Sequence, residues 1–320
     1  FSRMLQRRRE RTVLVVFTLG LLFAVYYLTF SPRCLFTYIV FGVFSKLEPH
    51  DQSDVTIITA FLDLGSFRKG KSLVYTPQHY IEWAETYKYL ANPLIVYTDS
   101  TAFQQWFLNV RTGKENRTSI IRLNRTNVPS FQRIDKVVRV FSDPNYPKFY
   151  PNTVLPEYAC SQHAKVDFVA MSIRENPFAT KYFAWLDIGY FRYTTFRKRK
   201  FWIVVPPEMD DNKMAVNEIE SPDFSIHPET IFKSNKVWVG GGMVLAAGST
   251  YLRYIEEYRR ALDYFLQRGL FNTDQQVMYS MFTDLGRKTL NITSELQTYT
   301  GSHWQCWFYL GYLCYKEEVD

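Results

Sequence analysis

Three aspartates follow apolar segments that have the composition of buried strands. Asp63 comes after "VTIITAF", Asp99 ends "NPLIVYTD", and Asp187 ends "YFAWLD". A carboxylate in such a place is a ligand for a hard cation such as Mg²⁺ or Mn²⁺, together with other protein groups, phosphate oxygens and water. Whether these residues can act together depends on the elements that carry them.

Strand-like and helical segments alternate along the chain. The segments 77–90 and 156–176 read as helices, and a third helix is predicted over 249–269, with Ser249 suited to its N-cap. Alternation of this kind predicts an α/β fold with a mostly parallel sheet and helices on both faces. Ligands of such sheets lie beyond the carboxyl ends of the strands, so the three aspartates are expected to face one crevice.

Two further features are candidates for this crevice. Gly240, Gly241 and Gly242 interrupt an apolar run, which suggests close approach by a ligand or by backbone; a bulge is the alternative. Arg192 opens "RYTTFRKRK", the most basic segment beyond the N-terminus, and is a candidate for contact with phosphate or an acidic acceptor. A solvated loop is the alternative for this segment.

The helix predicted over 156–176 contains two more polar side chains of interest, His163 and Lys165. Either one faces the crevice or solvent, and the sequence leaves this open.

The basic character of the chain is concentrated at its N-terminus. The net charge is +7, of which residues 1–50 contribute +5 through seven Lys/Arg and two Glu, so +2 remains for the rest. This distribution argues against a nucleic-acid partner. Residues 12–30 carry no charge and follow "RRRER", which indicates a transmembrane helix with a cytosolic N-terminus. A cleaved signal peptide is the alternative, but no small-x-small cleavage pattern follows.

We therefore predict a basic cytosolic tail (1–11), a transmembrane signal anchor (12–30), a stem (31–53) and one luminal domain (54–320). This is the topology of a single-pass type II protein of the Golgi or ER membrane. Three sequons agree with a luminal domain: Asn116-Arg-Thr, Asn124-Arg-Thr and Asn291-Ile-Thr. In an oxidising compartment Cys306 and Cys314 are candidates for a disulfide across a short loop; burial as free thiols is the alternative.

Several segments, in this order, resemble the HtrL/YibB family. The likeness rests on "VTIITAFLDLG", "NPLIVYTD", "PEY…HAKVDF…ENPF", "YFAWLDIGYFR", "VGGGMVLA" and "TDQQVM", and covers roughly residues 54–285. The family is regarded as glycosyltransferase-like, with a GT-A nucleotide-sugar-binding fold. The resemblance implies an enzyme that transfers a sugar from a nucleotide-sugar donor, a UDP-sugar, to a glycan, lipid or protein acceptor.

The resemblance also implies a divalent cation on the donor side. GT-A enzymes use a DxD motif to hold Mn²⁺ or Mg²⁺ against the donor diphosphate, whereas this chain has Asp187-Ile188-Gly189, with one carboxylate. Asp187 would bind the cation and Gly189 would let backbone approach the sugar. A turn-opening aspartate before a glycine is the alternative. His303 would complete the metal shell, or is an ordinary polar histidine.

On the acceptor side the resemblance implies Asp274, with Gln275 beside it. Asp274 would be the general base in an inverting reaction and would position the sugar in a retaining one. The alternative is a helix N-cap at Thr273 or Asp274. Fold analogy places three further residues at the nucleotide base and ribose: Asp63, Arg68 and Asp99.

Two other functions fit parts of the sequence. A non-catalytic relative that binds glycan through the same fold would explain the missing second carboxylate. A glycoside hydrolase would need a pair of carboxylates at a defined separation, and the sequence shows no obvious pair.

Overall fold

The computed structural model describes residues 54–301 and 306–318. The predicted tail, anchor and stem lie outside these residues. Within the described part, no helix combines the length and the apolar composition that crossing a bilayer requires.

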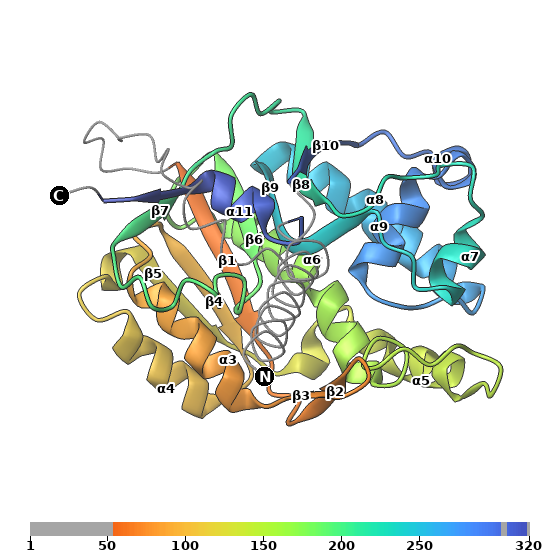
Figure 1. Cartoon of the computed structure of the whole chain (residues 1–320), viewed down its shortest axis with the longest axis horizontal. Helices are drawn as coiled ribbons and strands as arrows, with labels where there is room; N and C mark the ends of the chain where they lie inside the picture. The colour runs from red at the N-terminus through yellow and green to blue at the C-terminus, as the bar shows by residue number, and fades with distance from the viewer. Residues whose placement is uncertain (1–53, 302–305, 319–320) are drawn as a thin grey trace, which may run out of the picture. The chain divides into compact units, whose positions relative to one another are not determined.

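The domain contains short and long strands, helices and 3₁₀ turns (Figure 1). The strands are β1 (Val55–Phe61), β2 (Phe67–Lys69), β3 (Leu73–Tyr75), β4 (Leu94–Thr98), β5 (Thr118–Arg122), β6 (Tyr182–Leu186), β7 (Phe201–Ile203), β8 (Lys213–Glu218), β9 (Val239–Ala247), β10 (Glu295–Thr300) and β11 (Tyr315–Glu317). The helices are α3 (Pro77–Ala84), α4 (Thr101–Val110), α5 (Ile134–Ser142), α6 (Pro156–Glu175), α7 (Pro228–Lys233), α8 (Gly248–Gln267), α9 (Asp274–Phe282), α10 (Asp284–Leu290) and α11 (Tyr309–Cys314). The 3₁₀ turns are η1 (Glu85–Lys88), η2 (Glu115–Arg117), η3 (Arg125–Asn127) and η4 (Phe131–Arg133).

Seven strands form the central sheet, in the order β10-β8-β9-β6-β1-β4-β5. The pairs β1–β4, β1–β6, β4–β5 and β8–β10 are parallel, while β9 runs antiparallel to both β6 and β8. The prediction of a mixed α/β fold with a mostly parallel sheet is confirmed. Since Leu186 pairs with Met243, the start of β9 lies beside the carboxyl end of β6.

Both faces of the sheet are covered, which explains why its central strands are almost continuously apolar. One face carries Ile58 and Trp185 into a buried cluster with residues of α6, α8 and α9. On the other face, the Tyr87 hydroxyl from η1 donates to Thr59 of β1, and Phe103 of α4 stacks on Phe61. Figure 1 shows α3 and α4 near the β4–β5 side of the sheet and α8 and α9 near β8 and β9.

Helix α6 packs against β1 and β6 and is buried along most of its length. It starts at Pro156, whose fixed φ suits a first turn, and ends before Asn176, which adopts the left-handed conformation (φ 36°). This agrees with the helix predicted over 156–176. Because α6 is covered on nearly all sides, its two central polar residues, His163 and Lys165, are buried as well.

Candidate functional site

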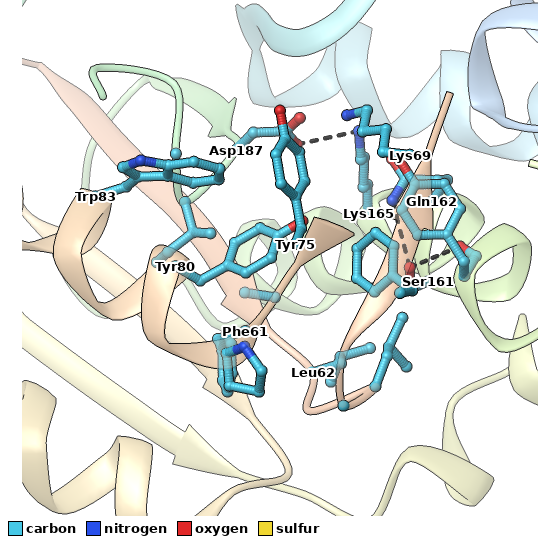
Figure 2. A pocket seen from close by; sticks show the side chains of 18 of the residues that line it. Phe61, Leu62, Lys69, Tyr75, Tyr80, Trp83, Ser161, Gln162, Lys165 and Asp187 are labelled. Carbon is cyan, nitrogen blue, oxygen red and sulfur yellow. Dashed lines mark hydrogen bonds and ion pairs between the residues drawn. The ribbon is translucent and has the colours of Figure 1, made fainter. Parts of the chain in front are cut away.

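A cavity of about 130 Å³ lies at the carboxyl ends of β1 and β6. Its walls come from the residues that follow these strands, the β2–β3 hairpin, α3 and α6 (Figure 2). A cavity at the carboxyl edge is the arrangement that the order of strands and helices predicts.

Aromatic side chains form one wall of the cavity. The Trp83 ring meets Tyr75 edge to face at 5.2 Å and Tyr80 at 5.1 Å between centroids. Figure 2 shows Trp83 and Tyr80 on one side, facing Lys69, Lys165 and Gln162. A Cβ on Gly189 would lie 2.5 Å from the Trp83 ring, so glycine is needed there to make room for the aromatic wall.

The opposite wall contains a buried ammonium group. Lys165 Nζ lies 3.0 Å from Asp187 Oδ1, 3.1 Å from Asp274 Oδ2 and 3.0 Å from the Gly241 carbonyl oxygen. An ammonium group has three donors, and each one has an acceptor here. Burial alone would lower the pKa of Lys165, but Asp187 and Asp274 outweigh it and raise the pKa, so the side chain stays charged.

Asp187 is held in position and yet remains open to the cavity. The Trp185 indole N–H donates to Asp187 Oδ1 (2.8 Å), and the Asp187 backbone N–H donates to the Gly242 carbonyl (2.8 Å). Its side chain is 42% exposed. Among the described residues, Oδ2 has no hydrogen-bond partner, which leaves it available to a ligand.

Asp274 lies behind Lys165, with a side chain only 9% exposed, and does not line the cavity. It is the first residue of α9, whose N-cap is Thr273, and Gln276 completes a capping box. A Cβ on Gly241 would lie 2.1 Å from Asp274 Oδ2, so the glycine allows this close approach. The acceptor-side role of Asp274 stays a prediction, while the alternative of a helix N-cap is present at Thr273. In its buried position Asp274 can hold Lys165 in place. Gln275, its neighbour, is also outside the cavity lining.

Two cations in the cavity have no carboxylate partner among the described residues. Lys69 Nζ lies 5.3 Å from the centre of the Tyr75 ring, and Arg192 Cζ lies 5.1 Å from that of Trp83. Burial and then the nearby charge of Arg192 lower the pKa of Lys69. Two like charges in a partly buried cavity destabilise each other, and an anionic ligand would relieve this.

A family profile described as a bacterial protein of unknown function (HtrL_YibB) matches residues 53–283 of this chain. The chain belongs to the HtrL/YibB family. No curated protein matches it. Among solved structures, core-mannan synthase A from Aspergillus fumigatus, in an Mn/GDP form, is similar at 9% identity with a TM-score of 0.39, over 81% of this chain and 75% of that one.

In this HtrL/YibB chain, three residues expected at the nucleotide do not line the cavity. Asp99 forms an ion pair with Arg125 (2.6 Å), and the Asp63 backbone N–H donates to the other Asp99 oxygen (2.8 Å). Arg68 stacks over the Tyr150 ring at 4.4 Å. All three residues follow β1 or β4, as predicted. Arg125, from the segment after β5, binds Asp99 and the Asp63 carbonyl, so these two residues contact another loop and not the cavity.

The glycine run of β9 also lies outside the cavity lining of this HtrL/YibB chain. A Cβ on Gly240 would be nearest to Ile219, and one on Gly242 would be nearest to Tyr190. The run is therefore approached closely by side chains of the chain itself. A register shift between β8 and β9, at Val216 and Asn217, lies opposite it.

A divalent cation does not fit the described residues around Asp187. Within the described part of this HtrL/YibB chain, no three His, Cys, Asp or Glu side chains are grouped so that they could hold an ion. The second carboxylate near Asp187 is Asp274, and Lys165 lies between the two. His303, the expected further ligand, lies outside the described residues.

The three cysteines among the described residues are free thiols: Cys160 and Cys314 are buried and Cys306 is half-buried. The candidate disulfide between Cys306 and Cys314 is not formed in this structure, and the alternative, burial as free thiols, describes Cys160 and Cys314 but not the half-buried Cys306. The sequon asparagines Asn116, Asn124 and Asn291 are exposed, as glycosylation requires, and the modification itself stays a prediction.

His163 has a structural role. Its Nε2–H donates to the Asn272 carbonyl (3.1 Å), and the Tyr258 hydroxyl donates to Nδ1 (2.6 Å). Burial lowers the pKa of His163 to about 3. The unfolded chain takes up a proton near the ordinary pKa of about 6.5, so the stability from this residue is complete above that pH and is lost as the pH falls towards 3.

Between pH 7 and pH 5, His163 alone should lower the free energy of unfolding by about 2 kcal/mol. Urea unfolding of the wild type and of His163→Gln at both pH values measures this change. The difference between the two proteins' pH-dependent changes in the free energy of unfolding cancels the contributions of the other titrating groups. Equal pH effects in both proteins would contradict the assignment.

Proposed function

We propose that this chain is a glycosyltransferase that moves a sugar from a nucleotide-sugar donor, a UDP-sugar, to a glycan, lipid or protein acceptor. One observation carries the proposal. A cavity at the carboxyl edge of the sheet combines an aromatic wall with the half-exposed carboxylate of Asp187 and with two cations, Lys69 and Arg192, that have no carboxylate partner among the described residues. The GT-A character implied by the family resemblance supports the same function.

The parts of a nucleotide sugar match these groups. Aromatic faces such as Tyr75 and Trp83 stack on bases and sugar rings. Lys69 and Arg192 provide charge-assisted hydrogen bonds for the diphosphate, and Asp187 Oδ2 accepts a hydrogen bond from a sugar hydroxyl. A cavity of about 130 Å³ encloses only part of such a donor, so the rest extends from its mouth.

The proposed reaction exchanges one bond at the anomeric carbon for another. The acceptor hydroxyl oxygen bonds to this carbon, and the bond from the carbon to the diphosphate oxygen breaks. The electron pair of that bond leaves with the nucleoside diphosphate, and the hydroxyl proton passes to solvent. The contribution of the chain is to orient the donor and to stabilise the negative charge of the leaving group through Lys69 and Arg192.

Removal of either cation should weaken donor binding. Loss of a hydrogen bond to a charged group costs about 1.5–3 kcal/mol, so Lys69→Met and Arg192→Gln should each raise the Kd for UDP by roughly 10- to 100-fold. Isothermal titration calorimetry with UDP and with GDP, ADP and CDP measures the effect and the base preference. Lys200→Met, a basic residue outside the cavity lining, is the matched control and should bind as the wild type does. If no nucleotide binds, or if all variants bind equally, the proposal is wrong.

The second candidate is a glycan-binding protein without transferase activity. Two features favour it. The chain lacks the second carboxylate of a DxD motif, and its one carboxylate there, Asp187, forms an ion pair with Lys165. Incubation with a panel of nucleotide sugars separates the two, because a transferase slowly hydrolyses its donor even without an acceptor. Glycan binding with neither donor binding nor hydrolysis would favour the second candidate.

We also propose a type II topology in the Golgi or ER membrane, with the described domain in the lumen. The exposed sequon asparagines and the apolar segment 12–30 support it. A glycan-removing enzyme should then increase the gel mobility of the chain from cells, and the triple substitution of the sequon asparagines by glutamine should abolish that shift.

A further inference from the structure

Two carboxylates that are far apart in the sequence meet at one point in the cavity wall. Asp187 arrives at the end of β6 and Asp274 at the start of α9, and the backbone carbonyl of Gly241 joins them from β9. Two carboxylate oxygens and a carbonyl oxygen are ligands that a hard divalent cation prefers. Here all three surround Lys165 Nζ at 3.0–3.1 Å.

A divalent cation cannot join this group without displacing the ammonium. All three donors of Lys165 are in use, and its side chain is only 10% exposed. If a metal ion took over the carboxylates, Lys165 would remain buried without its acceptors and beside a second positive charge. Binding of a metal ion between these carboxylates is therefore unfavourable while Lys165 is present.

The charge of a bound diphosphate is then balanced by other side chains. Lys165 is neutralised by the carboxylates behind and beside it, whereas Lys69 and Arg192 carry their charges into the cavity without a carboxylate partner in the described part of the chain. Each phosphate of a nucleotide-sugar diphosphate carries one negative charge. The two positive charges of Lys69 and Arg192 therefore balance the two negative charges of the diphosphate without a metal ion.

We propose that this chain binds the diphosphate of its donor without a divalent cation: the Lys165 ammonium holds the cation's place between Asp187 and Asp274, and Lys69 and Arg192 neutralise the phosphates. The proposal rests on the proposed donor site. It replaces the metal ion implied by the family resemblance with residues of the chain itself.

The first test measures binding of UDP to the full chain in EDTA and in Mn²⁺ by calorimetry, after the nucleotide panel has identified UDP or another diphosphate as the one that binds. The expected Kd values agree within about threefold. Binding that appears only with Mn²⁺ would overturn the inference. Failure of every nucleotide in both conditions would instead overturn the proposed function, and the second test would still decide whether Lys165 excludes a cation.

The second test uses Mn²⁺ alone and detects bound metal by electron paramagnetic resonance. The wild type should bind no Mn²⁺ at Asp187, whereas Lys165→Ala should gain one Mn²⁺ site because it leaves both carboxylates and the Gly241 carbonyl without their cation. Lys165→Ala/Asp274→Asn is the matched control and should lose the gained site. A folded Lys165→Ala that binds no Mn²⁺ would contradict the inference. If this variant does not fold, the wild type remains decisive: a Mn²⁺ signal that Asp187→Asn removes would overturn it.

Discussion

Replacing Lys165 with methionine is expected to lower the free energy of unfolding by about 3–5 kcal/mol, because it leaves Asp274 buried without its partner. Methionine keeps most of the volume of lysine. The decrease in the free energy of unfolding then comes from removal of the charge and not from a new cavity. Urea unfolding followed by tryptophan fluorescence measures the change.

The matched control for this prediction is Lys181→Met. Lys181 also forms an ion pair, with Asp211 at 2.6 Å, but both side chains are about half exposed, and water replaces the lost partner. Its stability should change little. The double variant Lys165→Met/Asp274→Leu should recover much of the loss, because it removes both members of the buried pair. Equal effects for Lys165→Met and Lys181→Met would contradict the structural account of Lys165.

Gly241→Ala is expected to destabilise the domain by about 3 kcal/mol and to weaken nucleotide binding. The new methyl group would lie 2.1 Å from Asp274 Oδ2, and Asp274 cannot move aside without leaving Lys165. The same unfolding measurement, together with calorimetry with UDP, checks both effects.

Gly240→Ala controls for the general effect of placing alanine in β9. Its Cβ would meet the Cδ1 atom of Ile219 at 3.2 Å, at the far end of a flexible side chain that can shift. A stability change below about 1 kcal/mol is expected there. If Gly240→Ala destabilised the domain as much as Gly241→Ala, the cause would be alanine in β9 in general and not the contact with Asp274.

The elements of the fold follow from local patterns. The apolar runs that contain β1, β4 and β6 were predicted because buried parallel strands need little but apolar residues, and α6 was predicted from Pro156 to its end at Asn176. The segment 77–90 was predicted as one helix, whereas α3 ends at Ala84 and η1 continues it. Such tightening of a last turn depends on tertiary packing, here of Tyr87 against β1.

The site was predictable only in part. Asp187 lines the cavity as expected, because a residue that ends a parallel strand reaches the carboxyl edge whatever its neighbours are. Gly189 and Arg192 line it too. Asp63 and Asp99 reach the same edge, but their contact with Arg125 depends on the loop after β5, which no local pattern describes.

Lys69 and the aromatic wall were not anticipated. Lys69 belongs to a hairpin with three residues in each strand, too short for an alternation pattern to be visible. Trp83 and Tyr80 lie in the segment 77–90, whose pattern predicts a helix but does not show that its aromatic residues face a cavity. Local sequence does not predict the position of Lys165, because its two carboxylate partners are 22 and 109 residues away along the chain.

The antiparallel direction of β9 has a consequence for how relatives of this domain can differ. Because β8 and β9 run in opposite directions, residues 219–238 leave and re-enter the sheet at the same edge as the cavity. This connection contains α7, which packs against α9, and Ile231 and Phe232 of α7 are fully buried. Its length can therefore change mainly within residues 220–227, which are mostly exposed, at about 0.6 kcal/mol for each doubling of the loop. A change within α7 would instead disturb the helix that begins with Asp274.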